Sequence, residues 1–259
     1  MKLHHITSIM KNDLRVLKKV KLRMLEITYF PLTTLVMWGL FALQSKQYAF
    51  QAGLIVLVVN LFWSFTQLAQ QEANMFMMED LWTLNIRHYF IAGITEFEYI
   101  IAKLTMSTLV ATMVAVVLVT VAQWFGAPLF QNLPHVIGLA GIALLGSLAL
   151  ALFIAGSVLM LGREYAFLCW SSLSLFIFLS APFYSPSILP AAVRWITEIM
   201  PFTYVFEGAR AIATSTAIPQ GMLLHAALIA GAYFVLAWPY YWWAFNRARK
   251  SGMLARIAS

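Results

Sequence analysis

Charged residues are scarce in this chain, and cysteine is almost absent. Asp, Glu, Lys and Arg make up 10% of the 259 residues, whereas soluble domains carry roughly 25%. The single cysteine, Cys169, lies within an apolar stretch, so it forms no intrachain disulfide and lacks partners for a thiolate metal site. Its expected role is packing as a small residue. This composition argues against a soluble domain and against a disulfide framework.

The sequence also lacks the motifs that carry common chemistry. No G-x-x-x-x-G-K-[ST] phosphate loop is present, so we expect no ATP binding of that kind by this chain. No H-E-x-x-H motif or Cys/His cluster has metal-ligand spacing, and the five histidines are scattered. The apolar stretches hold almost no ionisable residue, whereas ion-coupled carriers usually keep such groups at mid-membrane. We predict no catalytic residue, no metal site and no cofactor bound by this chain.

Hydrophobic residues make up 62% of the chain and are concentrated in long uncharged stretches. A helix needs about 20 apolar residues to cross the bilayer, and backbone groups in lipid must be paired within the segment. The longest stretch, 104–162, must hold two helices, because Gly126-Ala127-Pro128 marks a turn within it. We therefore predict an all-α integral membrane protein with six transmembrane helices, at residues 27–45, 49–71, 101–124, 136–160, 166–183 and 221–244.

Basic residues indicate how these helices are oriented. Seven Lys and Arg residues lie in the first 26 positions and four in the tail after residue 245. With six crossings both ends lie on one side, and the excess of basic residues predicts that this side is cytoplasmic. The same placement explains the net charge of +7 by topology rather than by nucleic-acid binding.

The expected organisation is a basic cytoplasmic segment at 1–26, a transmembrane domain at 27–245 and a basic cytoplasmic tail at 246–259. Within the first segment, residues 10–25 resemble an interfacial helix. Its apolar residues Met10, Leu14, Leu17, Val20 and Met24 fall on one face at helical spacing. Such a helix can lie flat on the membrane with its cations on lipid headgroups.

Two segments between the predicted spans are also informative. Residues 72–90 are rich in Met, Phe and Trp at helical spacing and carry acids, which favours a partner-docking helix; a helix resting on the membrane is the alternative. Residues 184–216 are apolar and proline-rich, which favours two short helices in an external re-entrant hairpin. Glu207 and Arg210 are three positions apart and could pair there, either to orient the hairpin or to line a substrate path.

The stretch from Phe178 to Arg210 resembles the permeases of type-two ABC exporters, the family that exports polysaccharides, glycolipids and drugs. It reads F-L-S-A-P-F-Y-S-P-S-I-L-P and later P-F-T-Y-V-F-E-G-A-R. The positions that match the family pattern are Leu189, Pro190, Pro201, Thr203, Tyr204 and Arg210. Met200 stands where the family commonly has Asn, and Ala92-Gly93-Ile94 replaces the usual S-P-L. The segment E-D-L-W-T-L-N-I resembles the family's coupling helix.

The resemblance implies a mechanism and its partners. Two copies of the permease would pair, and each would bind a cytoplasmic ABC ATPase that holds ATP and Mg²⁺. A glycolipid, a polysaccharide or an amphipathic drug would pass between the copies. The residues assigned to ATPase coupling are Met75, Met78, Glu79, Trp82, Asn85 and Arg163. The residues assigned to the substrate path or re-entrant hairpin are Phe176, Phe183, Tyr184, Pro201, Tyr204, Glu207 and Arg210.

Further expectations concern location and rival functions. The expected site is a bacterial inner membrane, with membrane lipids as partners and no nucleic acid. A lipid-modifying membrane enzyme is one alternative, and it would depend on residues such as Glu198, Glu207 or Arg210. A structural or assembly subunit that transports nothing is the other.

Overall fold

A computed structural model describes residues 2–19, 21–44, 50–83 and 85–251. In this part of the chain the regular elements are α-helices and short 3₁₀ turns, without a strand. Five of the described helices are long and apolar enough to cross a membrane: α2 (Lys21–Gln44), α3 (Phe50–Trp82), α5 (Glu96–Trp124), α6 (Leu133–Leu161) and α10 (Met222–Lys250). The all-helical fold is therefore confirmed, and five of the six predicted spans correspond to helices that are long and apolar enough to cross a membrane.

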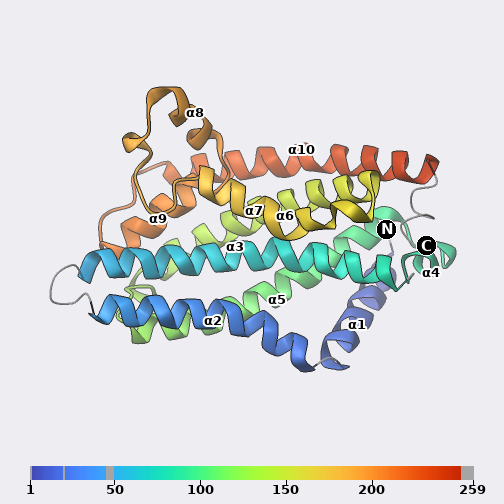
Figure 1. The fold of residues 1–259 in the computed structure, drawn as a ribbon, viewed down its shortest axis with the longest axis horizontal. Helices are drawn as coiled ribbons and strands as arrows, with labels where there is room; N and C mark the ends of the chain where they lie inside the picture. The colour runs from blue at the N-terminus through green and yellow to red at the C-terminus, as the bar shows by residue number, and fades with distance from the viewer. Residues whose placement is uncertain (1, 20, 45–49, 84, 252–259) are drawn as a thin grey trace.

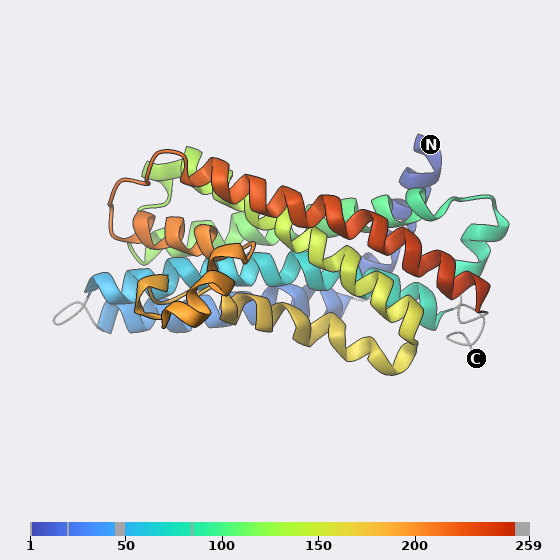
Figure 2. The same cartoon turned by 90° about the horizontal axis from the view of Figure 1, so that it is seen from above.

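The long helices form one elongated bundle around α3 (Figures 1 and 2). Helices α2, α5 and α6 all pack on α3, and α3 is the most buried of the five, whereas α2 and α10 have the smallest buried shares. Helix α10 packs along α6, where Gly156 faces Ala244. Small residues at such a contact let two helix backbones approach closely, which favours association in lipid.

The fifth predicted span, 166–183, is shorter in the structure. A 3₁₀ turn occupies Arg163–Phe167, and α7 (Leu168–Leu179) has 12 residues. Two features limit the length of α7. Gly162 has φ +108°, which ends α6 and starts the turn. Ala181, with φ +49°, precedes Pro182, and a residue before proline is disfavoured in helical conformation.

The segment after the second predicted span also differs. We expected a separate helix at 72–90, but α3 continues without a break to Trp82, and α4 (Asn85–Ile91) follows as a distinct helix. The charged residues of this part of α3 do not interrupt it because they are paired. Glu72 and Glu79 both bind Arg23, and Asp80 binds Lys103.

Buried amides join α3 to two neighbouring elements. Gln70 Nε2 donates to the carbonyl oxygen of Cys169 at the start of α7 (3.1 Å), and Asn74 Nδ2 donates to that of Ala151 on α6 (2.9 Å). Gln70 also donates to Asn74 (2.5 Å). Side-chain hydrogen bonds of this kind stabilise contacts between helices in a membrane, so these amides help to position the short α7 against the bundle.

The ends of the chain lie near the same end of the bundle (Figure 1). Helix α1 (Leu3–Lys19) begins earlier than the expected interfacial helix and ends before it. Its buried face is Ile6, Ile9, Asp13 and Leu17, whereas Leu14 of the expected apolar face is exposed. Helix α10 continues to Lys250, so the expected tail is partly helical; its last residues, 252–259, lie outside the described residues.

Candidate functional site

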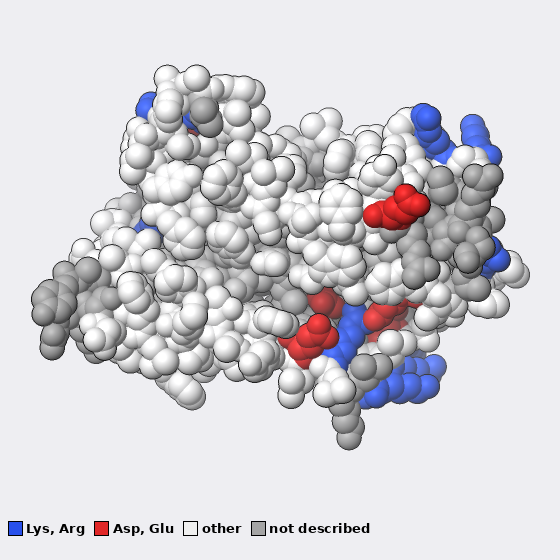
Figure 3. Space-filling model, viewed as in Figure 1, with Lys and Arg blue, Asp and Glu red and all other residues white. Residues whose placement is uncertain are grey.

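A groove of about 650 Å³ opens on the face formed by α2, α3 and α7. Residues of α2, among them Ile27, Phe30 and Pro31, form one wall, and α3 forms the floor. Trp170 of α7 lies at the opposite rim. Figure 1 shows α3 between these two helices, and Figure 3 shows the same face. Its charged atoms form a mixed acidic and basic cluster near α2 and further patches toward the right-hand end, and most of the remaining surface is uncharged.

The floor of the groove carries a row of uncharged polar residues. Asn60, Ser64, Gln67 and Gln71 all line it, and their spacing of three and four places them on one face of α3. Asn60 is 8% exposed, and its amide oxygen Oδ1 has no hydrogen-bond partner among the described residues. Trp63 Nε1 donates to Gln67 Oε1 (3.1 Å). The row offers amide and hydroxyl groups to a molecule in the groove.

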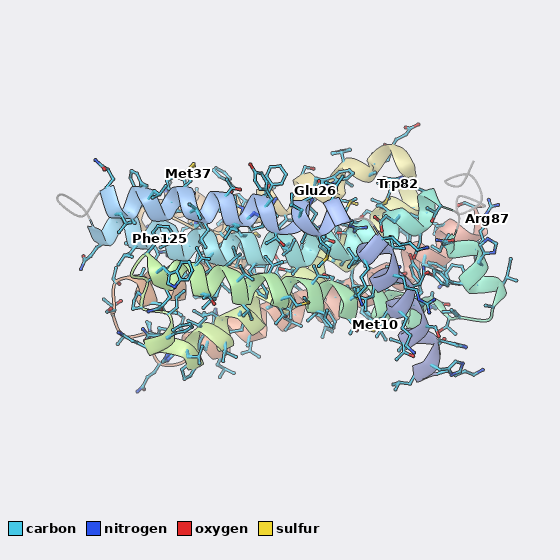
Figure 4. The ribbon with its side chains drawn as sticks, turned by 90° about the horizontal axis from the view of Figure 1, so that it is seen from below. Met10, Glu26, Met37, Trp82, Arg87 and Phe125 are labelled. Carbon is cyan, nitrogen blue, oxygen red and sulfur yellow. The ribbon has the colours of Figure 1, made fainter. Side chains whose placement is uncertain are left out.

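One end of the groove is charged. Arg23 of α2 binds Glu72 (3.3 Å) and also Glu79 of α3, and its guanidinium lies 4.9 Å from the centre of the Phe76 ring. Glu26 lines the same end but forms no salt bridge to a described residue. It lies on α2 near the end that adjoins α1 (Figure 4). This end of the groove therefore holds three carboxylates and one guanidinium, which is an excess of negative charge.

A second ionic cluster lies under α1, outside the groove. Lys103 of α5 is fully buried and contacts Asp13 of α1 (2.8 Å) and Asp80 of α3 (2.5 Å). Tyr99 donates its hydroxyl to Asp80 (3.1 Å). Desolvation by burial is the largest influence on Asp13 and raises the pKa of its carboxyl to about 6, although Lys103 acts in the opposite direction. The cluster joins three helices that are distant in sequence.

The start of α1 is also held against α5. Glu98 accepts hydrogen bonds from the backbone N–H of Lys2 (2.5 Å) and from Nδ1 of His5 (2.9 Å). The same carboxylate accepts from the backbone N–H of Thr95, and the Thr95 hydroxyl accepts from that of Glu98, which completes a capping box. One acidic residue thus both caps α5 and anchors α1.

The hairpin at the opposite end of the bundle contains α8 (Ala191–Ile199) and α9 (Thr203–Ala213), where two short helices were expected. Arg210 does not form a salt bridge with Glu207. Its Nη1 instead donates to the carbonyl oxygens of Ala181 and Pro182, each at 2.8 Å. Charged donors make strong hydrogen bonds to carbonyls, so Arg210 fastens α9 to the turn that follows α7.

Comparison with protein-family models identifies the family of this chain. The model described as ABC-2 type transporter matches residues 7–214, which include α1 to α9 almost entirely. The chain belongs to the ABC-2 type transporter family. This confirms the predicted resemblance: the protein is a multi-pass membrane permease, the membrane component of an ABC transporter. A comparison with curated proteins gives no match.

The residues assigned to ATPase coupling do not form one surface in this ABC-2 type transporter. Met78 is fully buried, while Met75 and Glu79 line the groove. Trp82 is exposed near the end of α3, and Asn85 begins α4. The backbone of Arg163 lies in the turn before α7, and its side chain lies outside the described part of the chain. The coupling role of these residues stays a prediction.

The residues assigned to the substrate path are divided between two places. Phe183 stacks on Trp63, with ring centres 6.0 Å apart, and so adjoins the groove. Phe176 lies on α7 and Tyr184 in the segment after it. The remaining four, Pro201, Tyr204, Glu207 and Arg210, belong to the hairpin; Tyr204 packs against the ring of His225 (4.8 Å). None of these seven is among the residues that line the groove.

Sequence reasoning missed both the polar row and the buried ionic cluster. The row had a detectable signal, because Asn60, Ser64, Gln67 and Gln71 recur at helical spacing within an uncharged stretch. The cluster had none. Asp13, Asp80 and Lys103 are separated by at least 23 positions, and their contact depends on how α1, α3 and α5 pack.

Proposed function

We propose that this chain is the permease subunit of an ABC exporter, powered by a separate cytoplasmic ATPase. Membership of the ABC-2 type transporter family is the observation that carries the proposal. The sequence has no phosphate loop of its own, so ATP-driven transport by this chain requires a partner that binds ATP. The cargo is a glycolipid or polysaccharide, or else an amphipathic drug-like molecule.

The chain crosses the membrane six times in this proposal, with α7 as the fifth crossing. The apolar segment Glu164–Leu179 extends about 26 Å, at about 2.0 Å per residue in its 3₁₀ turn and 1.5 Å per residue in α7. This is less than the roughly 30 Å of hydrocarbon. The hairpin of α8 and α9 follows it and re-enters the membrane from outside to complete the depth. Both ends of the chain are then cytoplasmic, in agreement with their position at one end of the bundle (Figure 2).

ATPase docking is proposed for the cytoplasmic end, at α4 and the end of α3. Figure 4 shows Trp82 and Arg87 at this end. Ile91 of α4 is 83% exposed, and an exposed hydrophobic residue beside charge is typical of a protein contact. ATP binding would close two ATPase subunits and shift two copies of this chain between states, because ATP has different affinities for those states.

The alternative of a lipid-modifying enzyme has weaker support. Arg210, one of its required groups, donates to two backbone carbonyls and so has a structural task. Glu198 and Glu207 belong to different helices, α8 and α9. No feature of the described residues specifically favours the other alternative, an assembly subunit that transports nothing.

Affinity purification tests the proposal. The tagged full chain is extracted in mild detergent, and companions are identified by mass spectrometry. A stoichiometric partner that carries a phosphate loop supports the permease function. If the chain purifies alone under several gentle conditions, the ATPase partnership loses its support and the enzyme or assembly role moves ahead.

Variants on α4 make this experiment sharper. Ile91→Glu places a charge on the proposed docking surface and is expected to reduce recovery of the ATPase at least several-fold. Ile188→Glu is the matched control, because Ile188 is also an exposed isoleucine but lies in the 3₁₀ turn just before α8 of the hairpin. Equal recovery with both variants would remove α4 from the docking surface.

A further inference from the structure

We propose that the groove between α2, α3 and α7 binds an amphipathic organic cation. This inference deepens the proposed function, on which it rests for its physiological meaning. It selects one of the cargo classes left open above. Three features of the groove support this proposal: its excess of carboxylates, its hydrogen-bond acceptors without a usual donor, and the position of its aromatic rings.

The charge of the groove favours a cation. Its ionisable lining consists of Glu26, Glu72, Glu79 and Arg23. Arg23 is already engaged by Glu72 and Glu79, so no free basic group remains in this lining to receive a phosphate or carboxylate. Glu26 is exposed and unpaired among the described residues. A positively charged ligand would gain from Glu26, whereas an anion would meet three carboxylates.

Two hydrogen-bond acceptors in the groove lack a usual donor. Asn60 is buried, yet its Oδ1 accepts no hydrogen bond from a described residue, and an unmet buried acceptor costs about 1–3 kcal/mol. Pro31 lacks an N–H, so it cannot pair with the carbonyl of Ile27 one turn earlier, and both residues line the groove. A ligand that donates hydrogen bonds, such as an amine, matches these acceptors.

Aromatic rings complete the match. Phe30, Trp63 and Trp170 line the groove, and Phe183 extends this surface by stacking on Trp63. The faces of such rings attract organic cations and pack well against apolar bodies. Asn60 and Glu72 are 12 positions apart on α3, or about 18 Å at 1.5 Å per residue. The groove therefore suits an elongated molecule with a cationic head and an apolar body.

The experiment measures binding to the purified full chain in nanodiscs of neutral phosphatidylcholine, without ATP or any partner. Fluorescence anisotropy of rhodamine 6G, an amphipathic cation, reports occupancy after subtraction of the signal from empty nanodiscs. Three competitors share one alkyl chain and differ in the headgroup: decylammonium, decyl phosphate and decyl glucoside. We expect the cation to displace the dye at concentrations about tenfold lower than the other two.

Two variants of exposed carboxylates test the site itself. Glu26→Gln is expected to weaken dye binding about five- to tenfold, while Glu164→Gln, an exposed acid outside the groove, leaves it unchanged. Both positions are exposed, so neither variant threatens folding. A third variant, Asn60→Leu, removes the unmet acceptor and is expected to weaken binding by a smaller factor.

Several results would overturn the cation class. These are equal potency of the three competitors, stronger displacement by the phosphate or the glucoside, or equal dye binding by the Glu26 and Glu164 variants. The test uses no ATPase, so such a result leaves the permease function standing. Conversely, failure to recover an ATPase in the purification would not change the binding data.

Discussion

At the scale of single residues, the buried lysine of α5 is the most consequential feature of the fold. Lys103 is 0% exposed and holds two carboxylates that come from different helices. A buried charge is tolerated when it is paired, and each member of this cluster depends on the others. Substitutions in this cluster should therefore differ sharply in how much they destabilise the protein, depending on which residue is replaced.

Lys103→Met is expected to destabilise the protein by about 3–5 kcal/mol, because it leaves Asp13 and Asp80 buried without their cation. Asp13→Asn should cost far less, since the pair of Lys103 and Asp80 remains. Thermal unfolding of the purified variants in detergent compares them. A small effect of Lys103→Met, similar to that of Asp13→Asn, would show that the cluster is well solvated.

The burial of Asp13 also predicts that the stability of the protein depends on pH. Its pKa is raised from 3.8 to about 6 in the fold by burial, so the folded state holds the proton more tightly than the unfolded state. The stabilisation from this proton is fully present below 3.8 and is lost as pH rises through about 6.

As pH rises between these two values, Asp13 should therefore lower the unfolding temperature of the protein. This contribution should be absent in Asp13→Asn. Lys103, Asp80 and Arg23 are the charged groups that act on Asp13, and all three stay in the variant. Parallel pH curves for the two proteins would contradict the assignment to Asp13.

At the scale of the elements, the contact between α6 and α10 depends on residues with little or no side chain. A Cβ atom at Gly156 would lie 3.1 Å from Cβ of Ala244 and 3.3 Å from the backbone of Tyr241. At Gly141 of the same helix, a Cβ atom would meet no atom within 4 Å. The two glycines thus separate the effect of helix propensity from the effect of packing.

Gly156→Leu is expected to destabilise the bundle by about 1–3 kcal/mol, because the added side chain forces α6 and α10 apart. Gly141→Leu should leave stability near that of the wild type or raise it, since glycine is a poor helix former. Unfolding temperatures in the same detergent provide the measurement. Equal losses at both positions would mean that α6 and α10 are not packed as the structure shows.

At the scale of the whole molecule, the number of crossings depends on the short α7. If α7 crosses with the help of the hairpin, positions 11 and 251 are both cytoplasmic, and positions 131 and 187 are both external. Without that crossing, positions 187 and 251 must both change side, whereas positions 11 and 131 keep theirs. The other helices cross the membrane in the same order in both arrangements. The side of the membrane from which each position is accessible therefore distinguishes the two arrangements.

Cysteines introduced at Lys11, Gln131, Ser187 and Ser251 in a Cys169→Ser background measure this alternation. All four positions are exposed, so labelling reports sidedness. A membrane-impermeant maleimide added to intact cells should label positions 131 and 187, and should label 11 and 251 only after the membrane is opened. Labelling of position 251 in intact cells would contradict six crossings.

The sequence by itself determined the membrane class, five long helices and the family. Each depends on local information: the length of an uncharged stretch, the residues that end a helix, or a motif read along the chain, as in Phe178 to Arg210. The two short helices α8 and α9 were expected from the proline-rich segment 184–216 for the same reason.

Tertiary structure alone decided the rest. Continuation of α3 past Glu72 depends on Arg23, and the environment of Asp13 depends on Lys103, 90 positions away. The groove exists because α2, α3 and α7 meet around the polar row. Pairing and burial are relations between segments distant in sequence, and no local pattern records which charges will meet once the helices have packed.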